Sequence, residues 1–497
     1  MFELISFSEF KTKSEESKSF IISKKLSIDL DTIISVYLKL KSFSKYSLLL
    51  ESAEASKNKG RYSVIALSPD LKWVCNNNNV EITNNDKLES SKNLTNKEII
   101  SSLEQFIDIS KLPEEHSLPP ICSGIFGYMN YDMVKYFENI PSHNNDEISI
   151  PEAQFIRPQI LVVFDNLKDE IIINIPIWIK NQDLKKLHSE KTSLFNQVIK
   201  HIQKPIKSSN KIYDDKTPEI EFSSNFSQTE YEDIVKRAKE YITAGDVFQI
   251  LPSRRFYGRF PYKGFSLYRS LRNLNPSPFL FYLNFDSFEI IGSSPEIMVR
   301  VNNEDVIIKP LAGTRKRGKD PSEDITLSKE LLSDEKEKAE HLMLIDLGRN
   351  DVGRVAKDSS VKVTKFMEIE YYSHVMHISS TVEGKILPNK SCLDALIAGF
   401  PPGTVSGAPK IRAMQIISDF EPLSRSFYSG CVGYFSLHQN YMDMAIMLRT
   451  ALLKDKKLYL QSGAGIVHDS IPGMEYEETS NKAQVLITAA NNSANFS

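Results

Sequence analysis

Short apolar runs separated by polar turns dominate the first two hundred residues. The run YSLLLES (46–52) predicts a buried strand, and RYSVIAL (61–67) alternates apolar and polar positions as a returning strand does. Between them, the polar segment EASKNKG (54–60) predicts a turn. The same criteria predict a second hairpin and a following helix at 159–164, 170–179 and about 182–203.

Helical periodicity becomes common beyond residue 225. The segment SQTEYEDIVKRAKEYITAG (227–245) has apolar residues at intervals of three and four, Ser227 or Thr229 caps its start, and Gly245 ends it. Further helices are predicted at 322–333, 334–348, 391–398, 408–418 and 474–489, and further strands at 246–256, 279–285, 288–292, 297–301, 430–436, 442–450 and 457–462. This order predicts an α+β fold with much antiparallel hairpin, because a doubly wound sheet would show repeated βαβ units.

Composition places the chain among soluble globular proteins and narrows its partners. Of 497 residues, 41% are apolar and 25% are charged, with a net charge of −3, so general nucleic-acid binding is not supported. No segment is apolar enough for a signal peptide or a membrane span. The polar segment at 204–219 lacks a clear period and predicts a boundary that divides the chain into 1–210 and 211–497.

Cysteine usage indicates a reducing compartment. Cys75, Cys122, Cys392 and Cys431 are dispersed and form no C-x-x-C pair. Zinc ribbons and thioredoxin-like chemistry are therefore disfavoured, and a cytoplasmic location is expected.

Four glutamates near the C-terminal end form two pairs with helical spacing. Glu337 and Glu340 lie three residues apart, as do Glu475 and Glu478, so each pair shares one face of a helix. Two helices that direct four carboxylates to one point would make an all-oxygen site, for which Mg²⁺ is best suited. The alternative is that both pairs are solvated helix faces.

Local pairing offers other roles for the same glutamates. Asp334 and Glu337 fit a capping box, in which Asp334 caps the helix and Glu337 reaches back to it. Glu475 and Glu478 can pair with Lys482 on the next turn. Spacing alone leaves these interpretations open beside the metal site.

A Gly/Pro-rich loop, FPPGTVSGAPKIRAM (400–414), runs into a predicted helix and can direct backbone N–H groups at an anion. A nucleotide-binding P-loop needs Gly-Lys-Ser/Thr, whereas Gly407 is followed by Ala408 and Pro409. The loop therefore favours a carboxylate ligand, with a structural turn before a capped helix as the alternative.

Other candidates for an anion site follow. Arg449 ends an apolar strand, where its guanidinium suits either a bound carboxylate or an internal salt bridge. Gly463 and Gly465 indicate a close approach of the backbone, or only a tight turn. His377 has His374 three residues before it but no further ligand at zinc spacing, so it is either a core histidine or a general acid or base.

Five long motifs occur in a fixed order, namely PLAGTRKRG (310–318), AEHLMLIDLGRNDVGRV (339–355), YYSHVMHISSTVEG (371–384), FPPGTVSGAPKIRAM (400–414) and QSGAGIV…EYEETSNKA (461–483). With LLLESAEASKNKGRYS (48–63) and GIFGYMNYD (124–132), they make the whole chain resemble the chorismate-utilising enzymes, and within them the large subunits of anthranilate synthases. The resemblance implies mostly antiparallel sheets packed as a sandwich with helices outside.

The resemblance also implies roles for single residues. Glu340 and Glu478 would bind Mg²⁺ directly, and Glu337 and Glu475 would do so through water. Glu296 would protonate the departing 4-hydroxyl of chorismate, and His377 would assist near the loss of pyruvate. Residues expected to bind the substrate are Thr404, Tyr428, Arg449, Gly463, Ala464, Gly465 and Lys482.

Two residues distinguish between reactions within the family. Relatives that add water carry a lysine at the position matching Gln249, and aminodeoxychorismate synthases carry a nucleophilic lysine at the position matching Ala312. Glutamine is a poor base and alanine forms no covalent adduct, so the resemblance implies ammonia as nucleophile and anthranilate as product. An aminodeoxychorismate synthase is the alternative. Pro252 and Arg254 stand where valine- or leucine-like residues and glutamine are common.

Regulation and a partner follow from the same resemblance. Two segments look like a tryptophan-binding site, although Phe279 and Leu280 replace the common tyrosine and methionine. Both segments could also be ordinary packed hairpins. A separate glutamine amidotransferase subunit would supply ammonia and form a hetero-oligomer. Expected tryptophan-site residues are Glu51, Ser52, Asn275, Pro276 and Ser277.

Overall fold

The computed structural model describes residues 4–27, 30–52, 60–141, 145–180, 182–206, 219–372 and 375–497. Most of the turn expected at 54–60, most of the boundary segment 204–219, and His374 lie outside the described residues.

The strands follow the apolar runs of the sequence. They are β1 (Ser19–Ser27), β2 (Tyr46–Glu51), β3 (Tyr62–Asn76), β4 (Asn79–Asn84), β5 (Lys87–Asn93), β6 (Gly124–Met129), β7 (Ala153–Asp165), β8 (Glu170–Trp178), β9 (Ser223–Ser224), β10 (Gln249–Ile250), β11 (Ser253–Arg259), β12 (Phe279–Phe285), β13 (Glu289–Ser294), β14 (Ile297–Asn302), β15 (Asp305–Ile308), β16 (Leu311–Lys316), β17 (Lys362–Tyr371), β18 (Val375–Lys385), β19 (Gly407–Ala408), β20 (Cys431–Ser436), β21 (Tyr441–Ile446), β22 (Thr450–Lys454) and β23 (Lys457–Gly463). Both predicted hairpins are confirmed, because β2 pairs with β3 and β7 pairs with β8.

The helices begin where the sequence provides caps. Ser227 caps α5 through the amide of Glu230, and Gly245, with a φ of +85°, lies just beyond the end of that helix. The helices are α1 (Phe7–Glu16), α2 (Ile33–Leu40), α3 (Asn96–Asp108), α4 (Leu184–Ile202), α5 (Gln228–Thr243), α6 (Gly264–Leu274), α7 (Pro321–Ser333), α8 (Glu335–Gly353), α9 (Cys392–Gly399), α10 (Gly403–Ser406), α11 (Lys410–Phe420) and α12 (Pro472–Asn491).

Antiparallel pairing joins the strands into one large sheet. Within the described residues, 21 strands form a continuous network, and β10 and β19 form a separate two-stranded pair. β2 pairs with β12 and β6 pairs with β20, so segments from both ends of the chain alternate in the same sheet. The division into 1–210 and 211–497 stays a prediction, since its boundary segment is mostly outside the described residues.

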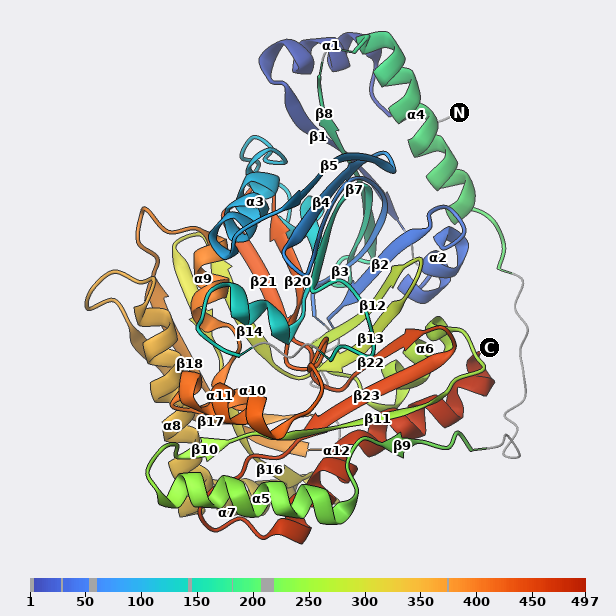
Figure 1. Ribbon diagram of the computed structural model, residues 1–497. Helices are drawn as coiled ribbons and strands as arrows, with labels where there is room; N and C mark the ends of the chain where they lie inside the picture. The colour runs from blue at the N-terminus through green and yellow to red at the C-terminus, as the bar shows by residue number, and fades with distance from the viewer. Residues whose placement is uncertain are drawn as a thin grey trace.

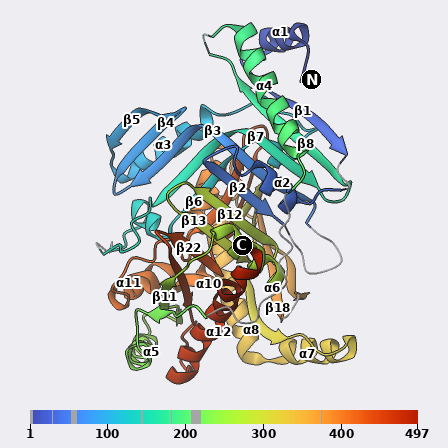
Figure 2. The same cartoon turned by 90° about the vertical axis from the view of Figure 1, so that its right-hand side faces the viewer.

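Apolar clusters hold the layers together. One cluster takes most of its residues from strands, among them Val64, Phe126, Leu161, Phe281 and Val432, and packs against the sheet faces. Helices cover the outside: α1 and α4 lie at one end, and α5, α7, α8 and α12 at the other (Figures 1 and 2). The predicted α+β class is confirmed. In the described part of the chain, no helix has both the length and the apolarity that crossing a membrane requires.

Two predicted strands are broken in the structure. The strand expected at 246–256 divides into β10 and β11, because Pro252 has no N–H to donate to a ladder. Its carbonyl instead accepts from the Tyr231 hydroxyl at 3.0 Å. The strand expected at 442–450 ends at Ile446, and Arg449 takes a φ of 45° before β22 begins. Both breaks occur beside predicted site residues.

Candidate active site

Helix α8 carries the first glutamate pair. Asp334 caps it as predicted, accepting from the amides of Lys336 at 3.1 Å and Glu337 at 3.2 Å. The side chain of Glu337 accepts a hydrogen bond from Arg315 at 3.4 Å and not from the backbone of Asp334. The prediction of a complete capping box is therefore wrong. Glu340 accepts from the side-chain amide of Gln249 at 3.0 Å. Burial, and then the neighbouring Glu340, raise the pKa of Glu337.

Helix α12 carries the second pair. Glu478 forms the predicted ion pair with Lys482 at 2.7 Å, and the same ammonium donates to the carbonyl of Gly463 at 3.1 Å. Glu475 is buried, and its burial raises its pKa. A hydrogen bond from the Ser470 hydroxyl acts in the opposite direction and lowers that pKa, but by less. Lys482 therefore connects the helix to the glycine-containing end of β23.

The two pairs have the donor chemistry of a Mg²⁺ site. All four groups are carboxylates, and in each pair like charge and burial disfavour full ionisation of one member, which a dication would relieve. Among the residues that the structure describes, however, no three histidine, cysteine, aspartate or glutamate side chains are gathered as metal ligands. The four-glutamate site stays a prediction.

Glu296 is the most strongly perturbed carboxyl of the site. It lies between β13 and β14, 6% exposed, and its carbonyl accepts from the Ile446 amide at 3.0 Å. Burial raises its pKa to about 8, although the Thr404 hydroxyl, the Leu311 amide and the charge of Arg449 act in the opposite sense. The carboxyl is therefore mostly protonated at neutral pH and can donate a proton.

His377 is held as a neutral ring on β18. Its Nδ1 lies 2.8 Å from the carbonyl of Gly313, so that nitrogen carries the proton and Nε2 keeps its lone pair. Burial lowers the pKa of His377 to about 4. The Gly313 carbonyl acts in the opposite direction, whereas the nearby charges of Arg449 and Lys482 lower the pKa further. Gly313, with a φ of +64°, brings this turn beside Glu337, because a Cβ there would lie 3.1 Å from the Glu337 carboxylate.

Arg449 offers a guanidinium for which the described residues provide no ion-pair partner. It is half-buried, and no carboxylate in the described residues lies within ion-pair distance of it, nor does its side chain donate a hydrogen bond there. The internal salt bridge considered for it is not formed with any of the described residues. Thr404 is similar, since its buried hydroxyl forms no hydrogen bond of ordinary geometry with the described residues. Both groups lie beside Glu296.

The glycines of the 463–465 segment permit close contacts inside the site. A Cβ on Gly463 would lie 2.8 Å from the carbonyl of Pro252 and 3.0 Å from the Tyr428 hydroxyl. A Cβ on Gly465 would lie 2.8 Å from the side-chain nitrogen of Gln249. Between them, the amide of Ala464 donates to Pro252 at 3.3 Å. Close approach, and not only a tight turn, explains both glycines.

Ala312 lies on β16 and pairs with Ile378, next to the β18 position of His377. Its side chain is buried and its neighbour Leu311 presents an amide to Glu296. Ala312, Gln249, Glu296 and His377, the residues to which the resemblance assigns the chemistry, thus lie in one region, and their roles stay predictions.

A buried ion pair that the sequence did not reveal supports this region. Arg425 and Glu421, 1% and 4% exposed, are joined at 2.7 Å. Arg425 also donates to the carbonyls of Val405 at 2.8 Å and Leu251 at 2.5 Å, next to Thr404 and near Gln249. A Glu and an Arg four residues apart look like a surface helix pair, so only the fold shows this role.

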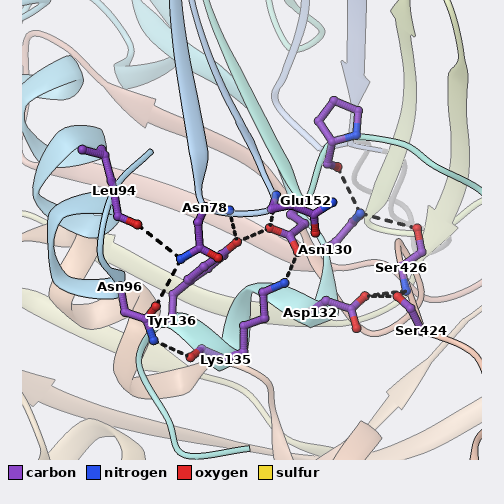
Figure 3. Close-up of polar contacts among 12 residues, drawn as sticks. Asn78, Leu94, Asn96, Asn130, Asp132, Lys135, Tyr136, Glu152, Ser424 and Ser426 are labelled. Atoms are coloured by element: carbon purple, nitrogen blue, oxygen red, sulfur yellow. Dashed lines mark hydrogen bonds and ion pairs between the residues drawn. The ribbon is translucent and has the colours of Figure 1, made fainter. Parts of the chain in front are cut away.

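The N-terminal half holds the same segment from the other side. Asp132 accepts from the Ser424 hydroxyl at 2.6 Å and from the Ser426 amide at 2.8 Å, on either side of Arg425 (Figure 3). In the same view, Glu152 binds Lys135 and the Tyr136 hydroxyl. Residues of the GIFGYMNYD motif and its neighbours therefore fix the position of a catalytic-half loop.

The expected tryptophan-site segments lie side by side, because Leu280 pairs with Glu51. The Glu51 carboxylate accepts from Arg272 through two nitrogens, both at 2.8 Å, and Asn275 donates to Ser277 at 3.4 Å. A cavity of about 870 Å³ is lined by Glu51 and Ser52 and continues to Leu311. Asn275, Pro276 and Ser277 do not line it, and the regulatory role stays a prediction.

Comparison with known proteins gives consistent results. The family model described as chorismate binding enzyme matches residues 47–488. Anthranilate synthase component 1 of Cereibacter sphaeroides is 42% identical over 495 residues, covering 99% of each chain, and that of Aquifex aeolicus is 42% identical over 98% of this chain and 97% of the relative.

Solved structures agree in fold. The crystal structure of anthranilate synthase component I from Streptococcus pneumoniae TIGR4 superposes with a TM-score of 0.76 at 34% identity, covering 93% of this chain and 98% of that one. The menaquinone-specific isochorismate synthase of Escherichia coli, at 17% identity and a TM-score of 0.71 over 95% and 94% of the two chains, shares the fold. The chain belongs to the family of chorismate binding enzymes.

Proposed function

We propose that the chain is the chorismate-converting component of an anthranilate synthase, which forms anthranilate and pyruvate in the first committed step of tryptophan biosynthesis. One arrangement carries the proposal: Glu296, whose raised pKa keeps it mostly protonated, lies beside Arg449, which has no ion-pair partner among the described residues. The same site has Gln249 and Ala312 at positions where the resemblance implies lysine in relatives with other reactions. Relatives that share about two fifths of its residues over their full length are named anthranilate synthase component 1.

Chorismate is a dianion, so its receptor needs cationic and N–H groups. Arg449 has no ion-pair partner among the described residues, and Lys482 reaches the end of β23, where Gly463 and Gly465 permit close approach of the backbone. The Thr404 hydroxyl, beside Glu296, and the Tyr428 hydroxyl, beside Gly463, complete the set. These groups orient the ring against Glu296.

Proton transfer by the chain's own residues accounts for the chemistry. Glu296 donates a proton to the 4-hydroxyl, which leaves as water while ammonia adds at C2. Loss of the C2 proton and of the enolpyruvyl side chain as pyruvate then gives the aromatic ring. His377 is neutral with a free Nε2, and it serves as hydrogen-bond acceptor or base in that second stage.

Mg²⁺ is the proposed cofactor. Glu340 and Glu478 would bind it directly and Glu337 and Glu475 through water. When bound, the cation would neutralise the ring carboxylate and draw charge from the ring.

Ammonia must come from elsewhere, because none of the four cysteines is set up as a glutaminase nucleophile. Burial raises the pKa of the Cys75, Cys122, Cys392 and Cys431 thiols to about 12. We therefore propose a separate glutamine amidotransferase subunit as partner in the cytoplasm, and L-tryptophan as an inhibitor that binds near Glu51 and Ser52.

The test uses the purified chain with chorismate, Mg²⁺ and ammonium at alkaline pH. Fluorescent anthranilate with an equal amount of pyruvate is expected. Formation of 4-amino-4-deoxychorismate without pyruvate would establish the alternative reaction, and isochorismate would show that water, not ammonia, is the nucleophile. Millimolar tryptophan should slow the reaction in the parent and less in a Ser52→Phe variant; equal rates with and without tryptophan contradict the regulatory proposal.

A further inference from the structure

Arg254 on β11 is a buried cation that has no anionic partner in the part of the chain that the structure describes. It is 1% exposed, and no carboxylate of the described residues lies within ion-pair distance of it. A guanidinium keeps its charge when buried, so its position must be compensated by hydrogen bonds and aromatic faces. The structure shows which element provides them.

Almost all of this compensation comes from the start of α12. The Nε of Arg254 donates to the Thr479 hydroxyl at 2.9 Å, and a terminal nitrogen donates to the Ser480 hydroxyl at 2.6 Å and the Tyr476 carbonyl at 3.4 Å. The guanidinium also lies 3.8 Å from the centre of the Tyr476 ring. Phe256 on its own strand lies further away, at 4.8 Å.

The residues that Arg254 contacts occupy one side of α12, and the proposed functional residues occupy another. Tyr476, Thr479 and Ser480 face the sheet, whereas Glu475, Glu478 and Lys482 follow the helical spacing of three and four toward the site. A rotation of the helix would therefore move all three functional side chains together.

We propose that Arg254 is a positioning residue that fixes the rotation of α12 and so places Glu475, Glu478 and Lys482 for Mg²⁺ and substrate. This inference rests on the proposed function of that site. The cation's planar fork suits the role, because it binds two hydroxyls one residue apart and a carbonyl at once, which a lysine ammonium cannot match from the same direction.

The neighbouring arginine provides a matched control. Arg255 is also 1% exposed, but it points to the opposite face of β11 and donates to Gln461 at 3.2 Å and to the carbonyl of Ser424. It has no contact with α12 among the hydrogen bonds of the described residues. Loss of either arginine removes a buried guanidinium, but only loss of Arg254 removes hydrogen bonds to α12.

The experiment compares R254Q, R254K and R255Q with the parent. We expect R254Q to raise the Mg²⁺ concentration that gives half-maximal ammonium-dependent activity about tenfold or more, the range for groups that orient metal ligands. R254K should give a smaller rise, and R255Q none, even if thermal denaturation shows that R255Q loses as much stability. Titration calorimetry of Mg²⁺ into each variant measures the same ranking without catalysis.

Ser480→Ala gives a milder variant that folds if R254Q does not, and it should show a smaller shift in the same direction. The proposal is overturned if R254Q and S480A bind Mg²⁺ like the parent, or if R255Q shows the same shift as R254Q. If the parent forms no anthranilate, the proposed function fails, whereas the calorimetric ranking still decides the role of Arg254.

Discussion

Helices α8 and α12 carry the same glutamate spacing but are held in different ways. α8 begins with a side-chain cap from Asp334, which Arg315 binds at 2.8 Å, so local sequence fixes its start. α12 begins with Pro472, and its first turn has no side-chain cap; a buried arginine from the sheet holds it instead. One half of the proposed metal site is thus set by near neighbours and the other by a residue more than two hundred positions away.

The largest expected effect on activity comes from Glu296, which lies outside both helices. The loss of kcat in its variant gives a reference against which variants of the two helices can be compared. Glu296→Gln should lower kcat about 10²- to 10⁴-fold with little change in chorismate KM, because an amide cannot supply the proton. Glu289→Gln is the control, since burial also raises the pKa of Glu289 but that carboxyl binds the Tyr282 hydroxyl and is not at the site. Steady-state kinetics with ammonium decide it, and a fully active Glu296→Gln contradicts the assignment.

The raised pKa of Glu296 also predicts how the stability of the protein depends on pH. Its pKa of about 8 in the folded chain is above its usual value of 4.5, so its contribution to stability is full below pH 4.5 and is lost as pH rises through 8. The Tm of Glu296→Gln relative to the parent should therefore increase from pH 5 to pH 9. A constant difference in Tm across this range would show that the carboxyl is not destabilised by burial.

Matched glutamate variants compare the two helices directly. Glu340→Gln and Glu478→Gln should each reduce Mg²⁺-dependent activity by more than about 100-fold, beyond the range for groups that only orient ligands. Glu335 and Glu477 are exposed neighbours on the same helices, and their glutamine variants should keep parental activity. If only the α8 variants lose activity, α12 does not contribute a ligand and the paired site is wrong.

Removing the cap tests the difference in how the helices are held. Asp334→Ala should cost about 1 kcal/mol of stability through the lost cap, measured by denaturant unfolding. It should also weaken Mg²⁺ binding modestly, because Glu337 loses its fixed starting turn. Ser227→Ala removes the corresponding cap of α5 and should lower stability alone. Equal Mg²⁺ binding in both variants would mean that the cap of α8 is only structural.

The smallest effect on stability is expected at an exposed ion pair in the middle of α12. The ion pair between Lys482 and Glu478 is nearly half exposed, so Lys482→Met should change the free energy of unfolding by less than about 1 kcal/mol. Chorismate KM should nevertheless rise about tenfold, as expected when one charge-assisted bond to a carboxylate is lost. An unchanged KM would place the substrate away from this lysine.

Sequence patterns predicted the elements well where local rules apply. An apolar run located β2, alternation located the start of β3, and capping residues located the starts of α5 and α8. The patterns failed where contacts between distant residues determine the end of a strand. Pro252 interrupts a predicted strand, and its carbonyl accepts a hydrogen bond from Tyr231. Arg449 has a positive φ and lies outside the strand that was predicted to include it.

The candidate site shows the same limit. Spacing found both glutamate pairs, and the family resemblance found Glu296, Gln249 and Ala312. Neither could find the buried arginines that hold the site together. No residue near Arg254 in the sequence indicates its contact with Thr479, and none near Arg425 indicates its contact with Leu251. A partner that is distant in sequence leaves no periodic signal.

The shared sheet has a mechanical consequence. Leu280 on β12 pairs with Glu51 on one side and with Ser293 on the other, so Glu51 and Ser293 lie on one line across three strands. At about 4.8 Å per strand, the line is roughly 10 Å long, and it ends three residues before Glu296. A ligand bound against Glu51 would therefore press on a short, rigid stretch of sheet that ends near the proposed proton donor.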